Sequence, residues 1–283
     1  MFGAESPSPY TCGVRCITLT TDFGTRDWFV GTMKGVILSL APNARIVDLT
    51  HEIAPGDVQA GAYALAAAYA FFPRHTIHVA VVDPGVGTSR RAIAVQTSNY
   101  FFVGPDNGLF SRVLTTEKVI AIHQLKNERY FLNRVSATFH GRDVFAPVAA
   151  HLSQGAEIGK VGPLLDDYVR LKSAAPKMRH GAISGEVQYV DRFGNAITNI
   201  PAAALARVGA AAKVFLNNKP VCRIGPAYQS VPENRPVAVV GSTGFLELAI
   251  NGASAAQAFG LKPGTRIELR TTVRRKGPLT RGD

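Results

Sequence analysis

The pattern of hydrophobic and polar positions along this chain changes near residue 172. In the first part, short apolar runs typical of buried strands alternate with segments whose apolar residues recur at helical spacing. The runs predict strands over 16–20, 46–49, 78–82, 92–95 and 100–103, and the helical spacing predicts helices over 28–40, 57–72 and 143–152, with Asp57 as an N-cap. This alternation predicts an α/β N-terminal domain over 16–171, with a largely parallel sheet flanked by helices.

A polar, proline-containing stretch over 172–180 has the composition of a linker. Beyond it, short β-type runs are separated by turn residues, at 185–190, 213–216, 237–240, 245–248 and 266–269. This pattern predicts a smaller all-β, barrel-like C-terminal domain over 181–271. We expect residues 1–15 to be a disordered lead-in and residues 272–283 to be a basic tail.

The composition is that of an ordinary soluble globular protein, with 283 residues, 46% of them hydrophobic and 18% charged. No apolar run approaches the roughly 20 residues that span a bilayer, and residues 1–13 lack the features of a signal peptide. The three cysteines, Cys12, Cys16 and Cys222, have no disulfide-framework or zinc-site spacing. We therefore expect a cytoplasmic protein without a membrane partner or a metal.

The net charge of +11 and the pI near 9.8 bring nucleic acid into consideration. No RNP sequence, zinc finger or basic zipper accompanies the charge. Much of the excess positive charge is expected in the tail. A solvated tail is favoured over an arm that binds along the phosphates of a nucleic acid, so nucleic acid is not an expected partner. The cations counted here are Arg270, just before the tail, and Arg274, Arg275, Lys276 and Arg281 within it.

The first candidate for chemistry is the loop that follows the strand 78–82. The strand ends on Asp83, Pro84 and two glycines then force a tight loop, and Arg90 precedes the next apolar run. Such a loop can fold Arg90 back onto Asp83 and hold the acid ionised at the end of a sheet, where α/β proteins place their chemistry. A structural ion pair that caps a turn is the competing interpretation.

Two further residues extend this candidate site. Asp22 ends the first strand, where an acid can accept both hydroxyls of a ribose, although it could instead cap the following helix. His140 lies in a loop beside a glycine, and with Asp83 and Arg90 it offers what activation of a water molecule needs; a histidine bonded to local backbone is the alternative. The chain has no GxGxxG motif and no Walker loop, which argues against NAD, FAD or ATP chemistry.

The C-terminal part contains weaker candidates. Asp191 and Asn195 stand four apart in a bend and could hold the ammonium and carboxylate of an amino acid, or form an ordinary turn. The segments 241–247 and 250–252 could present backbone groups to a flat base, or could be simple β-turns.

Five ordered segments together resemble one family, the adenosine-forming S-adenosyl-L-methionine (SAM) hydrolases, also called SAM hydroxide adenosyltransferases, which are related to fluorinase and chlorinase. The resemblance runs from about Ile17 to Leu269. The segments are Thr21–Gly24, Val82–Thr88, Gly104–Gly108, Phe139–Asp143 and Asp191–Asn195.

The resemblance implies a role for each candidate. Asp83, Arg90 and His140 would be the catalytic triad that positions water, and Asp22 would bind the ribose. Water attack at ribose C5′ would give adenosine and L-methionine without a cofactor, in a homotrimer with its sites between subunits. The methionine portion would be held by Asp191 and Asn195, with Ser242 nearby, and the adenine would lie against Glu247, Ile250 and Asn251. Phe193 is a further substrate-binding candidate.

Related halogenases carry a tyrosine where Asp83 stands, and fluorinase carries a serine where Gly141 stands. A carboxylate would repel an incoming halide, whereas beside water it can accept a proton. The resemblance therefore favours a hydrolase over a halogenase of the same fold. A non-catalytic SAM- or adenosine-binding protein, or a nucleic-acid binder driven by the basic tail, are the alternatives from other classes.

Overall fold

The computed structural model describes residues 15–172, 174–179, 181–209 and 212–271. The chain divides between Leu171 and Lys172 into two compact units, here called the N-terminal and C-terminal units. The expected lead-in, except for Arg15, and the expected tail lie outside the described residues. Arg15 does not belong to a free lead-in, because its Nη1 donates to the carbonyl of Leu152 at 3.2 Å and its guanidinium lies 4.8 Å from the centre of the Phe101 ring.

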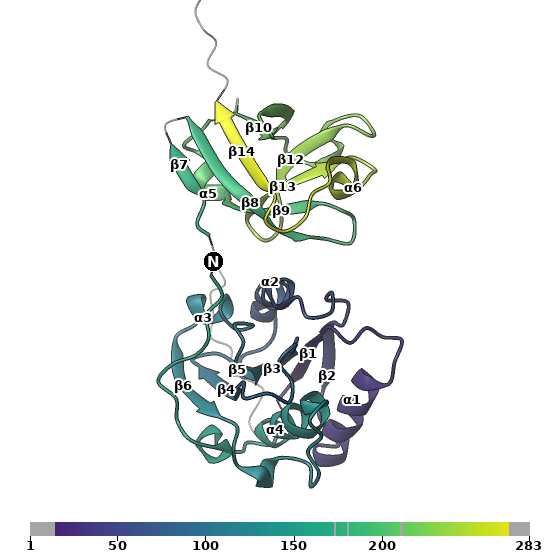
Figure 1. The fold of residues 1–283 in the computed structure, drawn as a ribbon, viewed down its shortest axis with the longest axis vertical. Helices are drawn as coiled ribbons and strands as arrows, with labels where there is room; N and C mark the ends of the chain where they lie inside the picture. The colour runs from purple at the N-terminus through teal and green to yellow at the C-terminus, as the bar shows by residue number, and fades with distance from the viewer. Residues whose placement is uncertain (1–14, 173, 180, 210–211, 272–283) are drawn as a thin grey trace, which may run out of the picture. The chain divides into compact units, whose positions relative to one another are not determined.

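A six-stranded sheet of order β2-β1-β3-β5-β4-β6 forms the middle of the N-terminal unit (Figure 1). Neighbouring strands are parallel except where β4 runs antiparallel to β5 and β6, so the prediction of a largely parallel sheet is confirmed. The strands are β1 (Ile17–Thr21), β2 (Ile46–Thr50), β3 (Ile77–Val81), β4 (Ala92–Thr97), β5 (Phe101–Pro105) and β6 (Val119–Gln124).

Helices cover both faces of this sheet, each over its own apolar core. Helices α1 (Phe29–Leu40) and α4 (Ala146–Ser153) pack over one core, and α2 (Val58–Ala68) and α3 (Val113–Thr116) pack over the other. Asp57 caps α2 as predicted, accepting a hydrogen bond from the N–H of Ala60 at 2.9 Å. The helix predicted over 143–152 instead begins with a π-helical turn over Gly141–Phe145 that runs into α4. Short 3₁₀ turns lie at Tyr69–Phe71, Glu128–Tyr130 and Ile158–Val161.

The C-terminal unit is an antiparallel sheet of order β11-β10-β14-β8-β9-β13-β12, with β7 paired to β8. A bridge between Ile224 and Ala238 joins the two ends of this path and makes the sheet nearly barrel-shaped, as predicted. The strands are β7 (Lys177–Arg179), β8 (Ala182–Val190), β9 (Ala196–Pro201), β10 (Ala212–Leu216), β11 (Lys219–Arg223), β12 (Pro236–Val240), β13 (Phe245–Ile250) and β14 (Arg266–Thr271), and the short helices are α5 (Ala202–Leu205), α6 (Ala255–Phe259) and the 3₁₀ turn Tyr228–Ser230.

Two features of this unit correct the sequence-based picture. Residues 177–179, expected within the linker 172–180, form β7 and pair with β8. Strand β9 was not predicted, because its middle residues Thr198 and Asn199 are polar but buried. Their side chains are satisfied by hydrogen bonds: the Thr198 hydroxyl donates to the Leu246 carbonyl, and the Asn199 amide accepts from the N–H of Glu186.

Among the described residues, no helix has both the length and the apolar character that crossing a membrane requires.

Candidate active site

Asp22 and Asp83 leave the same edge of the N-terminal sheet. Their strands, β1 and β3, are parallel neighbours with Thr21 paired to Val81, so the residues that follow them emerge side by side. Asp22 does not cap a helix; its Oδ2 accepts the N–H of Gly56 at 2.8 Å. Burial raises the pKa of the Asp22 carboxyl, and the nearby Asp83 charge adds to the rise, whereas backbone N–H groups oppose it.

Arg90 joins Asp83 to His140. Its Nε lies 2.9 Å from both carboxylate oxygens of Asp83, and its Nη2 donates to Asp83 Oδ2 and, at 2.8 Å, to His140 Nδ1. The side chains of Asp83 and Arg90 are only 4% and 11% exposed, so the pair is more than a surface turn cap. The guanidinium also lies over the buried Phe145 ring, 5.4 Å from its centre.

Glycine in the loop after β3 allows this arrangement. Gly87 has a φ of +78°, and a Cβ atom there would lie 2.2 Å from the carbonyl oxygen of Ala137. Only a glycine lets the loop approach that backbone. Because Ala137 is three residues from His140, this approach brings the loop of Asp83 and Arg90 against the segment that carries the histidine.

The hydrogen bond from Arg90 decides which nitrogen of His140 carries a proton. A guanidinium only donates, so Nδ1 accepts and the proton of the neutral ring is on Nε2. Neutral His140 then has no free lone pair with which to take a proton from water. The bond therefore narrows what His140 can do in water activation: its neutral ring can donate from Nε2, and among these three side chains only the Asp83 carboxylate is able to accept a proton.

The residues that follow His140 in the chain are tightly packed. Asp143 does not cap a helix; its fully buried carboxylate accepts the N–H of Ser136 at 2.8 Å and the Nε of Arg142 at 2.5 Å. Gly141 is equally confined, because a Cβ atom there would lie 3.2 Å from Met33 Sδ and 3.2 Å from the Phe139 ring. A serine at position 141 would therefore need these neighbours to move.

His51 is a supporting residue that the sequence-based reasoning missed. Its Nε2 lies 3.0 Å from Asp48 Oδ1, and its Nδ1 lies 2.9 Å from the hydroxyl of Thr21. Since the carboxylate can only accept, Nε2 carries the proton, and the Thr21 hydroxyl donates to Nδ1 while it accepts the N–H of Phe23. The carbonyl of His51 accepts the N–H of Gly24 at 2.7 Å, so the histidine holds the loop of Asp22 from both sides. Its position just after the strand beside β1 is the sequence signal that could have found it.

The electrostatics of His140 predict a pH dependence. Burial lowers the pKa of His140 below its ordinary value of 6.5, and the charge of Arg90 lowers it further. In the folded protein the ring is therefore still mainly neutral at pH 6.5, and its protonation, which would break the bond from Arg90, prevails only at lower pH. The same shift makes the folded state bind fewer protons than the unfolded state, so stability also decreases as the pH falls below 6.5.

We expect kcat/KM to decline as the pH falls, with an apparent pKa below 6.5. His151, in α4, also has a pKa lowered by burial but lies outside the triad, so His151→Gln should keep the same profile. An inflection above pH 6.5 in the wild-type protein would contradict the assignment of a neutral His140.

In the C-terminal unit, Asp191, Phe193, Asn195 and Ile250 line one cavity of about 660 Å³. Asn195 donates to Asp191 Oδ1 through its backbone N–H at 2.8 Å and to Oδ2 through its amide at 2.9 Å, which closes the bend. Phe193 is 77% exposed at its rim. The other residues that line the cavity are Tyr228, Gly252, Ala253 and Ser254.

The other predicted substrate-binding residues lie outside the lining of this cavity. Ser242 is exposed in the turn between β12 and β13, at the opposite end of β13 from Ile250. Glu247 is buried and accepts a hydrogen bond from the Tyr228 hydroxyl at 2.8 Å, and burial raises the pKa of its carboxyl. The Asn251 amide donates to the Val231 carbonyl. Tyr228, which connects the cavity to Glu247, had no signal in the sequence.

A glycine fixes the bend at this cavity and supports a prediction. Gly194 has a φ of +82°, and a Cβ atom there would lie 2.0 Å from Ser254 Oγ. Gly194→Ala should push Asp191 and Asn195 away from Ser254, lower stability by roughly 1–3 kcal/mol and raise KM more than it lowers kcat. Gly244→Ala is the matched control, because Gly244 has a φ of +79° but nothing within 4 Å of its Cβ position. Thermal unfolding and steady-state kinetics of both variants check this prediction. Equal KM values for the two variants would contradict a role of the cavity in substrate binding.

The chain is similar to known proteins along both units. Residues 17–162 match the family model described as the SAM hydroxide adenosyltransferase N-terminal domain, and residues 185–268 match that of the C-terminal domain. The (R)-S-adenosyl-L-methionine hydrolase of Salinispora arenicola is 40% identical over 256 residues, 89% of this chain and 97% of that protein. A fluorinase from an Actinoplanes species is 28% identical over 290 residues, 89% of this chain and 96% of that protein. The crystal structure of a conserved protein from Thermotoga maritima superposes with a TM-score of 0.86 at 38% identity, covering 90% and 99% of the two chains.

Proposed function

The chain belongs to the SAM hydroxide adenosyltransferase family, and from this premise we propose that it is an enzyme that hydrolyses SAM to adenosine and L-methionine. The observation that carries the proposal is the triad, in which Arg90 bonds to both Asp83 and His140 at the edge of the sheet. The related proteins named as SAM hydrolases have higher identity to this chain than the fluorinases do.

In the proposed reaction, water attacks ribose C5′ in line with the departing sulfur. The C–O bond forms as the C–S bond breaks, and the electron pair of that bond neutralises the sulfonium to give the thioether of methionine. Asp83 accepts the proton of the water, and His140 orients the water oxygen through its Nε2–H. Asp22 accepts the ribose hydroxyls. Because the sulfonium is already a good leaving group, the task of the site is to place water in line, and no cofactor is required.

Two features of the triad favour water over halide. The Asp83 carboxylate would repel an incoming anion, and its bonds to Arg90 hold it in position. The packing around Gly141 is tight, so that the serine that fluorinase carries there would need Met33 and Phe139 to shift.

The proposal assigns the methionine portion to the C-terminal cavity, with Asp191 facing the ammonium group. Glu247, Ile250 and Asn251 are assigned to the adenine. Ser242 is assigned to the vicinity of the methionine portion, and Phe193 to the rim of the cavity. We further propose a homotrimer in which the triad of one chain and the cavity of another form each site, in the reducing cytoplasm. The free thiols of Cys16 and Cys222 support that compartment.

The central experiment is to incubate the purified protein with SAM and to follow adenosine and methionine by chromatography. We expect equal amounts of both, with no dependence on chloride or fluoride. Formation of 5′-halo-5′-deoxyadenosine with added halide would decide for a halogenase. Tight binding of SAM without any product would decide for a binding protein.

A mixing experiment tests the shared site. Asp83→Asn and Asp191→Ala should each be inactive alone. If each site combines two chains of a trimer, unfolding and refolding them together in equal amounts should restore about a quarter of the wild-type activity. If each site lies within one chain, the mixture should remain inactive.

A further inference from the structure

The excess positive charge belongs to the C-terminal unit, and not mainly to the tail. Residues 172–283 hold 16 of the 31 Lys and Arg residues but only 6 of the 20 Asp and Glu residues, so they account for +10 of the net +11. Residues 272–283 contribute only +3 of this. The N-terminal unit is nearly neutral. The expectation that the tail carries much of the excess is therefore wrong, and most of the charge lies on the folded unit.

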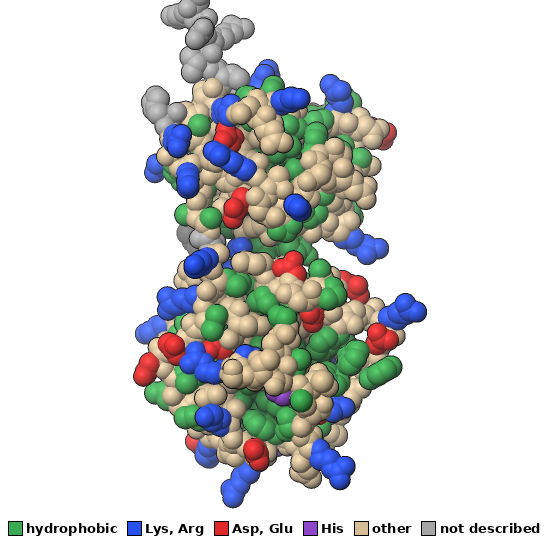
Figure 2. All heavy atoms as spheres, viewed as in Figure 1, with side chains coloured by type: hydrophobic (Ala, Val, Ile, Leu, Met, Phe, Trp, Pro, Cys, Tyr) green, Lys and Arg blue, Asp and Glu red, His purple; other side chains and the backbone are tan. Residues whose placement is uncertain are grey.

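The strand register gathers part of this charge on one face of the sheet. Cross-strand partners point to the same side, and one row of partners runs through β7, β8, β14, β10 and β11. The row reads Arg179, Ala182, Arg270, Lys213 and Arg223. The alternate residues Ile183, Leu269 and Val214 are buried in the core, so the row faces outward. At the usual strand spacing it is about 19 Å long. In Figure 2, Lys and Arg side chains gather over the part of this face that β7, β8 and β14 form.

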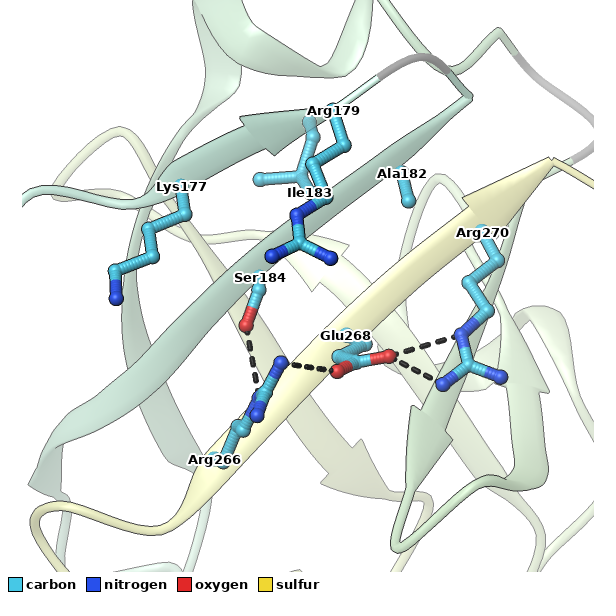
Figure 3. Close-up of a pocket in the computed structure, with 8 residues that line it drawn as sticks. All are labelled: Lys177, Arg179, Ala182, Ile183, Ser184, Arg266, Glu268 and Arg270. Atoms are coloured by element: carbon cyan, nitrogen blue, oxygen red, sulfur yellow. Dashed lines mark hydrogen bonds and ion pairs between the residues drawn. The ribbon is translucent and has the colours of Figure 1, made fainter.

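A hollow of about 270 Å³ lies at one end of this row, lined by Lys177, Arg179 and the β14 arginines (Figure 3). One carboxylate, that of Glu268, lies in it. Arg266 Nη2 donates to Glu268 Oε1 at 2.7 Å and Arg270 Nε donates to Oε2 at 2.9 Å, and the bonds from Arg270 lower the pKa of Glu268. Neither Lys177 nor Arg179 has an ion pair among the described residues, and Arg179 reaches over β8 towards Ser184. The hollow thus keeps an excess of positive charge.

An aromatic ring is part of the same face. Phe215 is half-buried on β10, and the guanidinium of Arg270 lies 4.7 Å from the centre of its ring. Guanidinium planes and aromatic rings are the surfaces on which unpaired bases stack. A row of cations with a stacking surface in its middle matches a single strand of nucleic acid, which offers regularly spaced phosphates and flat bases. An anionic lipid surface would also bind the cations, but it offers no flat group that could stack on the guanidinium.

We propose that this face, the row Arg179–Arg270–Lys213–Arg223 with the adjoining hollow, binds single-stranded nucleic acid without sequence preference. Phosphates lie along the cations, and bases stack at Arg270 and Phe215. The face uses no residue that the proposed hydrolase site uses, so the two proposals stand or fall separately.

The test is fluorescence anisotropy of the full chain with a labelled single-stranded RNA of about 20 nucleotides, at several salt concentrations. The variant Arg179→Ala/Lys213→Ala removes two charges of the row. The matched control Arg235→Ala/Lys262→Ala removes two charges of the same unit outside the row. None of these four side chains has an ion pair among the described residues, so both variants should fold.

We expect Kd to rise at least about tenfold in the row variant and less than about threefold in the control, and the slope of log K against log salt to become shallower by about 0.7 per lost phosphate contact. SAM hydrolysis should be unchanged in both. Absence of binding at low salt, or equal weakening in both variants, would overturn the proposal. Loss of binding only on deletion of residues 272–283, with the row variant unaffected, would assign binding to the tail. Binding to vesicles of anionic lipid but not to RNA would make the face a membrane contact.

Discussion

Asp83→Asn should lower the turnover of SAM by about 10²- to 10⁴-fold, the range that removal of a general base costs. Asparagine keeps an oxygen with which to accept from Arg90, so the loop and the position of His140 should persist. It cannot take a proton, and in the structure no other member of the triad has a free lone pair, because His140 Nδ1 accepts from Arg90. The Kd for SAM should change much less, since Asp22 and the C-terminal cavity are intact.

The adjacent ion pair provides a matched control for this variant. Arg91 contacts Asp106 as Arg90 contacts Asp83, and the side chain of Asp106 is only 1% exposed. Asp106→Asn removes the charge of one partner of a buried ion pair, as Asp83→Asn does, but should leave turnover within a few fold of the wild type. Single-turnover kinetics, calorimetric binding of SAM and thermal unfolding separate these effects. If Asp83→Asn retained normal turnover, Asp83 would not be the proton acceptor.

Arg90→Met should abolish most activity and also destabilise the fold. It leaves the Asp83 carboxylate buried without a partner, a change that costs about 3–5 kcal/mol in buried pairs. It also removes a charge that lowers the pKa of His140, so this pKa should rise. The ring would then be protonated at a higher pH than in the wild type.

Arg90→Lys distinguishes stability from catalysis. Lysine restores the positive charge but cannot reproduce the planar fork that contacts both carboxylate oxygens and the histidine together. We expect most of the stability to return while turnover stays at least about 100-fold below the wild type. Arg91→Lys, next in the chain, should have nearly normal turnover. Denaturant unfolding measures the stability, the turnover of SAM measures catalysis, and NMR titration measures the pKa of His140. Full recovery of turnover in Arg90→Lys would mean that Arg90 acts through its charge alone.

Local patterns in the sequence were sufficient to predict the strands that position the site. Apolar runs located β1 and β3, and each run ended on a carboxylate, so Asp22 and Asp83 were found from residues next to one another in the chain. The contact from Arg90 to Asp83, seven positions apart, followed from a short loop that contains a proline and two glycines. Strand β9 was missed because its buried polar residues break the pattern of alternation, and only their hydrogen-bond partners in other segments explain them.

The sequence by itself determined the two-unit organisation, the strand ends that carry the acids, and the family. Each of these depends on residues within short contiguous segments. Only the tertiary structure decided that Arg90 serves both Asp83 and a histidine 50 positions further along, and therefore on which nitrogen His140 holds its proton. It also decided that His51 supports the loop of Asp22, and that Arg179, Arg270, Lys213 and Arg223 share one face. These features depend on strand register and on the approach of distant loops, which no local pattern encodes.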